Sequence, residues 1–348
     1  MGPAEALRRV AYLLERDGAE TYKVRAFRQA AIAVDELGPG RLEQLASSRR
    51  LKDIPGVGDT TAGVIAEAIA GGTPGYLAQL EAVEPRPLSP DVLGLRASLR
   101  GDCHSHSDWS DGGSPIREMA EAAVALGHEY LVVTDHSPRL TVAHGLTAER
   151  LRSQLEVIGE LNEELAPFRL LTGIEVDILE DGSLDQDEEL LAALDVVVAS
   201  AHSKLRLEAP QMTRRVVAAV ESPHSDILGH CTGRLLTGKG REPSSFDAEA
   251  VFSACARTGK AVEINSRPER RDPPEELLKL AVGLGCWVSI DTDAHAPGQL
   301  EWLGFGCGQA VQAGVPAVSV VNSWPADRLL EWTASHDSAS APRRGRKS

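Results

Sequence analysis

The sequence predicts an α/β barrel preceded by a small all-α domain, and two patterns support this prediction. From about residue 100 onward, short apolar runs alternate with amphipathic helical segments, which is typical of parallel strands joined by right-handed crossovers. Seven or eight such units favour a closed barrel over an open sheet. Before residue 85, apolar residues recur at helical spacing and no β-branched alternation occurs.

The helical segment includes one turn signal, Pro55-Gly56-Val57-Gly58, between two helical runs. We expect a helical domain over residues 1–84, a proline-rich linker over 85–99, a barrel over 100–333 and a disordered basic tail over 334–348. The strands are predicted in chain order, with an opening strand that ends at Cys103. The later runs are Tyr130–Val133, Leu170–Ile174, Val196–Ala199, Ile227–Leu228, Ala261–Ile264, Trp287–Ile290 and Ala317–Val321.

Helical patterns fill the gaps between these runs. The clearest are Glu118–Leu126, Ala148–Leu165, Ala248–Ala256 and Glu276–Leu284. The 348 residues are 42% hydrophobic and 25% charged, which is ordinary for a globular protein and excludes a wholly disordered or fibrous chain.

The net charge of −15 disfavours a general nucleic-acid binder, because attraction to phosphate needs positive surface. This charge is uneven: residues up to Arg86 carry 11 basic and 12 acidic groups, and the remainder holds almost all of the excess. The second part of the chain therefore either repels anions or holds cations.

Five cysteines without a CxxC pair argue against a disulfide framework and a thiolate zinc site, and favour a reducing compartment. Residues 1–20 mix charged and apolar side chains at helical spacing, unlike a signal peptide. No apolar run approaches the ~18 residues that a membrane span requires. We expect a cytoplasmic protein with no membrane partner.

Polar side chains follow each predicted strand, where the carboxyl ends of parallel strands meet at one mouth. Imidazole suits Zn, Fe and Mn, and carboxylates can bridge two ions. Nine candidate ligands exceed the ~4 to 6 that one ion takes, so they suggest two or three ions. The polar residues that follow the predicted strands include His104, His106, Asp111, His136, Glu175, His202, His230, Asp293 and His295. The other histidines are read as surface or satisfied core groups: His128, His144, His224 and His336.

The segments HSHSDWSDG, TDHS, GIEVDI, ASAHS, GHCTGRLL, VEINSRPER and DTDAH resemble the successive motifs of the PHP (polymerase and histidinol phosphatase) phosphoesterases over residues 101–325. The resemblance implies a distorted (β/α)7 barrel with a trinuclear metal site, and the nine candidates match the ligands of that family. Cys231 stands where the family usually has a proline after the Gly-His pair, and Arg270-Arg271-Asp272 replaces the usual Arg-Leu-Asp. Neither change removes a ligand.

The segments GAETYKVRAFR and IPGVG resemble the helix-hairpin-helix domain of family X DNA polymerases. A glycine-rich hairpin lets backbone N–H groups approach a phosphate at a helix N-terminus. The residues expected to contact DNA are Gly56, Val57, Gly58, Lys23, Arg25 and Arg28. Val64 occupies the position of the Schiff-base lysine in those polymerases, so no lyase activity is expected. The chain looks like a bacterial family X polymerase without palm and fingers.

The expected function is a metal-dependent phosphodiesterase that acts on single-stranded or gapped DNA, as a 3′–5′ exonuclease or 3′-end processing enzyme in repair. Mn, Zn or Fe would generate a hydroxide that attacks phosphorus, and the bound ions would make the mouth locally positive. Glu175, Asp111 and His202 would bridge or hold the ions. Arg234, Lys204 and Arg270 are expected to clamp phosphate. Asp135 and Asp291 are expected to orient histidine ligands.

Two alternatives remain open. One is a phosphomonoesterase that resembles histidinol phosphatase, which the barrel motifs alone do not exclude. The other is a DNA-tethered module that binds metal without catalysis, which metal content and turnover would distinguish from an enzyme.

Overall fold

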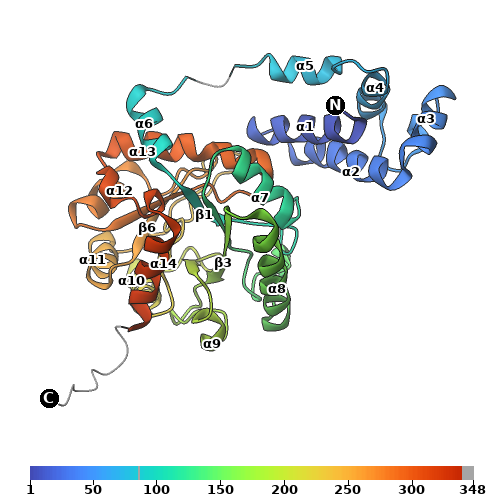
Figure 1. The fold of residues 1–348 in the computed structure, drawn as a ribbon. Coiled ribbons are helices and arrows are strands. Elements are labelled where there is room, and N and C mark those ends of the chain that lie inside the picture. The colour runs from blue at the N-terminus through green and yellow to red at the C-terminus, as the bar shows by residue number, and fades with distance from the viewer. Residues whose placement is uncertain (85–86, 339–348) are drawn as a thin grey trace. The chain divides into compact units, whose positions relative to one another are not determined.

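The computed structural model describes residues 1–84 and 87–338 (Figure 1). It forms two compact units. One consists of the described residues up to Pro87 together with Ala296–Gln299, and the other contains the remaining described residues. No helix among the described residues is both long enough and apolar enough to cross a membrane.

The first unit is helical, as its sequence pattern predicts. Its elements are α1 (Pro3–Arg16), α2 (Thr21–Leu37), α3 (Pro39–Ser47), the 3-10 turn η1 (Leu51–Asp53), α4 (Asp59–Ile69) and α5 (Gly75–Glu81). Leu7, Val10, Ala11 and Leu14 form one buried face of α1, and that face packs within a core shared with α2 and α4. Helical spacing of apolar residues therefore produced the fold of this unit directly.

The second unit is a seven-stranded parallel barrel in which the strands are neighbours in chain order. The strands are β1 (Gly101–Ser105), β2 (Tyr130–Val133), β3 (Arg169–Asp177), β4 (Val196–Ser200), β5 (Ile227–Leu228), β6 (Ala261–Asn265) and β7 (Trp287–Asp291). Their residues are almost all buried, because helices cover the outside of a parallel sheet.

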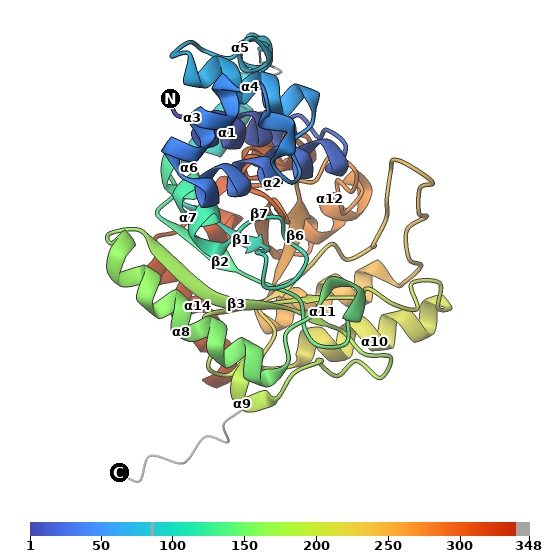
Figure 2. The ribbon, with the colours of Figure 1, turned by 90° about the vertical axis from the view of Figure 1, so that its right-hand side faces the viewer.

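The helices that cover the barrel follow the strands (Figure 2). They are α7 (Ile116–Ala125), α8 (Ala148–Leu165), α9 (Glu188–Leu191), α10 (Ala209–Glu221), α11 (Ala248–Thr258), α12 (Glu275–Gly283), α13 (Leu303–Ala313) and α14 (Ala326–Ser338), with 3-10 turns η2 (Thr141–Ala143) and η3 (Pro297–Trp302). Each strand's carboxyl end therefore opens into a loop at the same end of the barrel.

The barrel is nearly closed where its first and last strands meet. Ser105 forms a parallel bridge with Ala294, and the backbone N–H of His106 donates to the Ala294 carbonyl at 2.7 Å. The first strand extends to Ser105, beyond its predicted end at Cys103, so His104 lies within it.

The predicted strand over residues 317–321 is wrong. This segment forms two 3-10 turns, η4 (Ala317–Ser319) and η5 (Val321–Ser323), and only Val320 forms a bridge, to Val288. The side chain of Asn322 instead donates to the carbonyls of Gly101 and Ile290. The Asn322 side chain therefore takes the place of an eighth strand between β1 and β7.

Two predicted boundaries also differ from the structure. Residues expected to form part of the linker form α6 (Pro90–Ser98), which Ser89 caps and whose Val92 and Leu95 pack against the core beside α13. The helix α14 continues through residues 334–338, which were expected to belong to the tail. The rest of that predicted tail, 339–348, lies outside the described residues.

Candidate metal centre

Glu175 lies at the centre of a cluster of imidazoles. It is on β3 and is 1% exposed. Ring nitrogens of five histidines lie between 2.8 and 3.5 Å from its carboxylate oxygens. These are His104, His106, His136, His202 and His230. Residues at or beyond the ends of four other strands therefore converge on one carboxylate.

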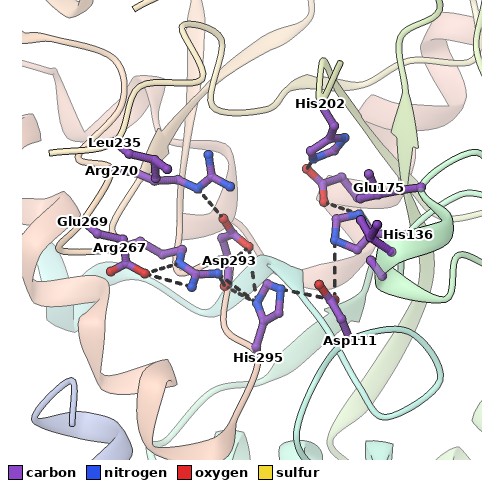
Figure 3. Close-up of a pocket in the computed structure, with 13 residues that line it drawn as sticks. Asp111, His136, Glu175, His202, Leu235, Arg267, Glu269, Arg270, Asp293 and His295 are labelled. Carbon is purple, nitrogen blue, oxygen red and sulfur yellow. Dashed lines mark hydrogen bonds and ion pairs between the residues drawn. The ribbon is translucent and has the colours of Figure 1, made fainter. Parts of the chain in front are cut away.

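Two further carboxylates extend the cluster. The Asp111 Oδ1 atom lies 3.3 Å from His295 Nε2 and 3.5 Å from His136 Nε2. The Asp293 Oδ1 atom lies 3.4 Å from His106 Nε2 and 3.5 Å from His295 Nδ1. All nine predicted ligands thus lie in one continuous cluster, part of which Figure 3 shows.

A tight turn places Asp111 at this site. The backbone N–H of Gly112 donates to the Ser107 carbonyl at 2.9 Å, and a Cβ atom at Gly112 would lie 2.6 Å from that carbonyl. The turn therefore requires glycine beside Asp111, because any side chain would collide with the backbone.

The donor set fits divalent metal ions. Three groups of side chains each bring their donor atoms within 4.8 Å of one another. The groups are His106 with Asp111, His136 and His295; His104 with His106 and Glu175; and His136 with Glu175 and His202. Imidazole and carboxylate together suit Zn, Mn and Fe.

Unpaired buried atoms point to the same conclusion. Among the described residues, both ring nitrogens of His106 and of His202, together with His104 Nε2 and Glu175 Oε2, are buried and form no hydrogen bond of normal geometry. Burying polar atoms without a partner is costly, and metal coordination would satisfy them. The cluster is therefore able to bind metal.

The electrostatics of the cluster couple its members. Burial would raise the pKa of Glu175, but the positive charges of His202, His104 and His136 outweigh it and hold that pKa well below its ordinary value. Burial lowers the pKa of His202, but Glu175 and Asp177 oppose it and raise the pKa to about 9. Burial, reinforced by His295 and His136, lowers the pKa of His106 well below normal, so this ring is neutral with a lone pair to offer.

Two acidic residues that support the cluster were missed by the sequence analysis. The Glu263 Oε1 atom on β6 lies 2.5 Å from His104 Nδ1, and the Asp177 Oδ1 atom on β3 lies 3.4 Å from His202 Nδ1. Glu263 stands within the predicted apolar run 261–264, and Asp177 lies beyond the predicted run 170–174, at the end of β3. A charged residue there signals a buried partner, because an unpaired buried charge is costly.

The predicted orienting roles of Asp135 and Asp291 are wrong. Asp135 accepts hydrogen bonds from Ser107 N at 2.8 Å and from Gln154 Nε2 at 2.6 Å. Asp291 accepts one from Cys103 N at 2.8 Å. Both carboxylates hold the loops and strands around the site, and Glu263 and Asp177 take the positions beside the imidazoles.

A pocket of about 330 Å³ opens onto the cluster. Asp111, His136, Glu175, His202 and Asp293 lie in its wall. Leu140, Val142 and Ala143 from η2 add an apolar side. Two arginines, Arg267 and Arg270, line it beside Asp293, across from Glu175 and His136 (Figure 3).

Of the three predicted phosphate-clamp residues, only Arg270 lines this pocket. Its Nε atom lies 3.2 Å from Asp293 Oδ2. Arg234 Nε donates instead to the Arg270 carbonyl at 3.0 Å, and Lys204 is exposed with Nζ 3.9 Å from Glu180. Arg267, two residues after Asn265 at the end of β6, lines the pocket and was not predicted, although its position after a strand was a usable signal.

The four remaining histidines belong to none of the three metal-capable groups. His128 Nε2 lies 3.1 Å from Arg96 Nη2, and His336 Nδ1 lies 2.6 Å from Asp226 Oδ1. His144 caps η2 in a left-handed conformation, and His224 lies in the turn after α10. Their placement agrees with a surface or core role.

The predicted DNA-contacting residues lie in the first unit. Gly56 has a φ of 80°, a conformation that favours glycine, and Gly58 is the N-cap of α4, where its N–H donates to Thr61 Oγ1 at 2.9 Å. Lys23 and Arg25 are exposed on α2. Arg28 instead pairs with the buried Glu15 at 2.5 Å, which commits its guanidinium to the helical core.

Comparison with known proteins places two domains on this chain. Residues 2–74 match the helix-hairpin-helix domain and residues 102–267 match the PHP domain. A Bacillus subtilis (strain 168) protein described as DNA polymerase/3'-5' exonuclease PolX is 41% identical over 226 residues. That match covers 65% of this chain and 39% of the relative, so this chain spans well under half of that protein.

Other relatives are shorter proteins. A probable phosphatase of Thermoanaerobacter sp. (strain X514) is 30% identical over 208 residues, covering 56% of this chain and 78% of the relative. One of Acetivibrio thermocellus is 32% identical over 204 residues, with the same coverage. A solved structure of histidinol phosphate phosphatase from Lactococcus lactis, complexed with zinc, L-histidinol and phosphate, is 20% identical with a TM-score of 0.46, covering 62% of this chain and 94% of that one.

Proposed function

Because this chain belongs to the PHP family of phosphoesterases, we propose that it is a metal-dependent phosphodiesterase that trims or processes the 3′ ends of DNA. The observation that carries the proposal is the convergence of five imidazoles on Glu175 at the floor of a pocket lined by two arginines. A carboxylate–imidazole cluster beside guanidinium groups suits the hydrolysis of a phosphate ester.

The nine-residue cluster would hold two or three divalent ions, of Mn, Zn or Fe. His106, Asp111, His136 and His295 form one group able to hold an ion, and Glu175 contributes to the other two groups. When bound, such ions supply Lewis-acid stabilisation of phosphate charge and activate water for attack on phosphorus.

The chain's own residues bind and orient the ester. Arg267 and Arg270 present guanidinium groups to the pocket, where they can donate to phosphate oxygens. Asp293 lies within 3.4 Å of Arg267 Nη1 and 3.2 Å of Arg270 Nε, so it holds both guanidinium groups in position. Placing them in advance lowers the entropic cost of orienting the substrate.

The helix-hairpin-helix domain favours DNA over a small molecule as the substrate. Backbone N–H groups at the start of α4 and the exposed Lys23 and Arg25 can contact phosphates without reading base sequence. The relative named as a 3'-5' exonuclease supports the same polarity. Single-stranded or gapped DNA is the proposed partner.

A phosphomonoesterase is the second candidate, because the shorter relatives are named as probable phosphatases. The pocket also suits a small ester: its volume of about 330 Å³ lies at the lower end of the range for ligand pockets. A DNA-tethered module without catalysis is the third. It accounts less well for a cluster with all nine candidate ligands present.

One paired assay tests these candidates. The purified protein is supplied with Mn²⁺ and offered p-nitrophenyl phosphate and a 5′-labelled single-stranded oligonucleotide. We expect a ladder of products shortened from the 3′ end. Fast turnover of p-nitrophenyl phosphate without shortening of the oligonucleotide would favour the monoesterase, and no turnover of either would favour the non-catalytic module.

A further inference from the structure

The mouth of the barrel carries its charge unevenly. The loops after β4, β5 and β6, residues 201–208, 229–247 and 266–274, contain eight Lys or Arg and five Asp or Glu. The loops after β1, β2 and β3, residues 106–115, 134–147 and 178–187, contain one basic and seven acidic residues. The first set of loops, called the basic rim below, therefore stands out from an acidic chain.

Three of the five acidic residues of the basic rim form contacts within it or cap the helix that follows it, whereas Glu208 and Glu242 are exposed. Asp272 accepts hydrogen bonds from the Thr232 hydroxyl at 2.6 Å and from the Thr232 N–H at 3.2 Å. Glu269 pairs with Arg267 at 2.9 Å, and Asp247 caps α11. With eight basic and five acidic residues, the rim keeps a net positive charge.

Its outermost cations remain available to a ligand. Lys204, Arg206, Lys239 and Arg271 are all exposed. The Nζ atom of Lys204 lies 3.9 Å from Glu180 Oε1, which is a long ion-pair distance. No described residue forms an ion pair with the other three side chains. Four cations thus face solvent around the half of the mouth that also supplies Arg267 and Arg270 to the pocket.

Internal bonds hold the basic rim in shape. The guanidinium of Arg234 donates to the Arg270 carbonyl at 3.0 Å, and Arg241 Nε donates to the Gly233 carbonyl at 2.5 Å. The N–H of Leu236 donates to the Glu269 carbonyl at 2.7 Å, which joins the β5 loop to the β6 loop. A surface formed in advance loses less entropy when it binds an extended ligand.

We infer that a single nucleic-acid strand whose end lies in the pocket runs outward over the basic rim, with its phosphates against Lys204, Arg206, Lys239 and Arg271. A positive groove that tracks the backbone is how proteins bind single strands without sequence preference. The opposite half of the mouth has more acidic than basic residues, including the exposed Glu180 and Asp181, and repels the same strand. This inference rests on the proposed function, because that function brings a strand end to the pocket.

The test removes two rim cations that lie outside the pocket lining. Arg206→Ala combined with Lys239→Ala is compared with Arg257→Ala combined with Arg169→Ala, which removes the same number of charges. Arg257 lies near the end of α11 and Arg169 begins β3, so both control residues lie at the opposite end of the barrel. Binding of a fluorescein-labelled oligo(dT) of about 12 nucleotides is followed by anisotropy over a range of NaCl concentrations. Equal Tm and equal metal content establish that each variant is folded.

Loss of two phosphate contacts should reduce the slope of log affinity against log salt by about 1.4 for the rim variant, whereas the control pair Arg257→Ala with Arg169→Ala should keep the wild-type slope. A wild-type slope in the rim variant overturns the inference. The inference is also overturned if a polyglutamate peptide of equal charge displaces the labelled oligo(dT) as well as unlabelled oligo(dT) does, because the rim would then bind any polyanion.

Cleavage of the same oligonucleotide is scored separately. If the rim variant shows the expected change in slope but the wild-type protein does not shorten the strand, the proposed function fails and the binding surface stands. If it shortens the strand while the slopes are equal, the proposed function stands and the inferred path fails.

Discussion

The Nδ1 atom of His104 on β1 lies 2.5 Å from the Oε1 atom of Glu263 on β6, and both side chains are fully buried. The other oxygen of Glu263 accepts hydrogen bonds from the backbone N–H of His230 and from Asn265 Nδ2. One carboxylate therefore links three strand ends and turns the Nε2 atom of His104 toward Glu175.

Glu263→Gln tests this arrangement. The amide keeps the size of the side chain but removes the charge that makes the His104 imidazole a stronger ligand. We expect metal affinity or activity to fall by about 10–100-fold, the usual cost of changing a residue that orients a metal ligand. The measurement is metal retention against a competing chelator, together with the rate at which the labelled oligonucleotide is shortened.

Glu276→Gln is the matched control, because Glu276 is exposed on α12. It should retain metal as the wild type does. Retention of metal by Glu263→Gln at the same chelator concentration as the wild type would show that Glu263 does not tune His104.

Metal removal should abolish turnover, and Glu175→Ala should do the same. Elemental analysis should give roughly two or three ions per chain for the wild type and fewer for Glu175→Ala. We expect the activity of the variant to fall by at least about 1,000-fold, which corresponds to roughly 4 kcal/mol of lost transition-state stabilisation. Chelator-treated wild type should recover activity on addition of Mn²⁺, and turnover that persists through chelation would contradict a metal mechanism.

The two arginines predicted to clamp phosphate should behave differently. Arg270 lines the pocket, so Arg270→Ala should raise KM about 10-fold, in line with the loss of a hydrogen bond to a charged group. Arg234 bonds to backbone carbonyls, so Arg234→Ala should act mainly on stability and lower the free energy of unfolding by about 1–3 kcal/mol. Steady-state kinetics and urea unfolding separate the two effects, and equal KM increases would contradict the assignment.

Stability should depend on pH through His128. Burial and the neighbouring Arg96 charge lower the pKa of His128 from 6.5 to about 3. Between pH 6.5 and about 3, His128 is protonated in the unfolded chain and neutral in the folded chain. The free energy of unfolding is therefore unaffected by this residue above pH 6.5 and decreases as the pH falls from 6.5 toward 3. The slope of this loss is about 1.4 kcal/mol per pH unit.

His128→Gln removes the titration and keeps an acceptor for the Arg96 guanidinium. Urea unfolding of both proteins between pH 6.5 and about pH 4.5 should give a slope shallower by about one proton for the variant. Parallel slopes would show that His128 does not titrate in this range.

In the first unit, removal of Arg28 should lower stability, whereas removal of the exposed cations of α2 should weaken DNA binding. Arg28→Ala would remove the cation beside the buried Glu15, which is 2% exposed and keeps the hydrogen bond from Gly298 N–H, at a cost of about 3 kcal/mol. Lys23→Ala with Arg25→Ala should change stability by less than about 0.5 kcal/mol each and weaken oligonucleotide binding. A normal Tm for Arg28→Ala, or unchanged DNA affinity for the double variant, would contradict these roles.

Several features of the protein could be predicted from its sequence alone. Apolar runs with β-branched residues predicted six later strands and the first strand of the barrel, because parallel strands are buried on both faces. The positions of polar residues just after these runs predicted that they meet at one mouth, because carboxyl ends of parallel strands share one end of the barrel. The resemblance to the PHP phosphoesterases selected nine of them, which converge in the structure. Residues 317–321 misled the same reasoning, since a short apolar run does not distinguish a strand from a buried turn.

Only the tertiary structure decided which side chains support that cluster. Asp135 and Asp291 adjoin predicted ligands in the sequence yet bond to other groups, whereas Glu263 and Asp177 lie beside imidazoles that come from other strands. Likewise Arg267 faces the pocket and Arg234 does not. The periodic pattern of apolar residues determines which residues reach the mouth of the barrel. The contacts among those residues depend on loop conformation and on packing between strands far apart in the chain, which the local sequence does not determine.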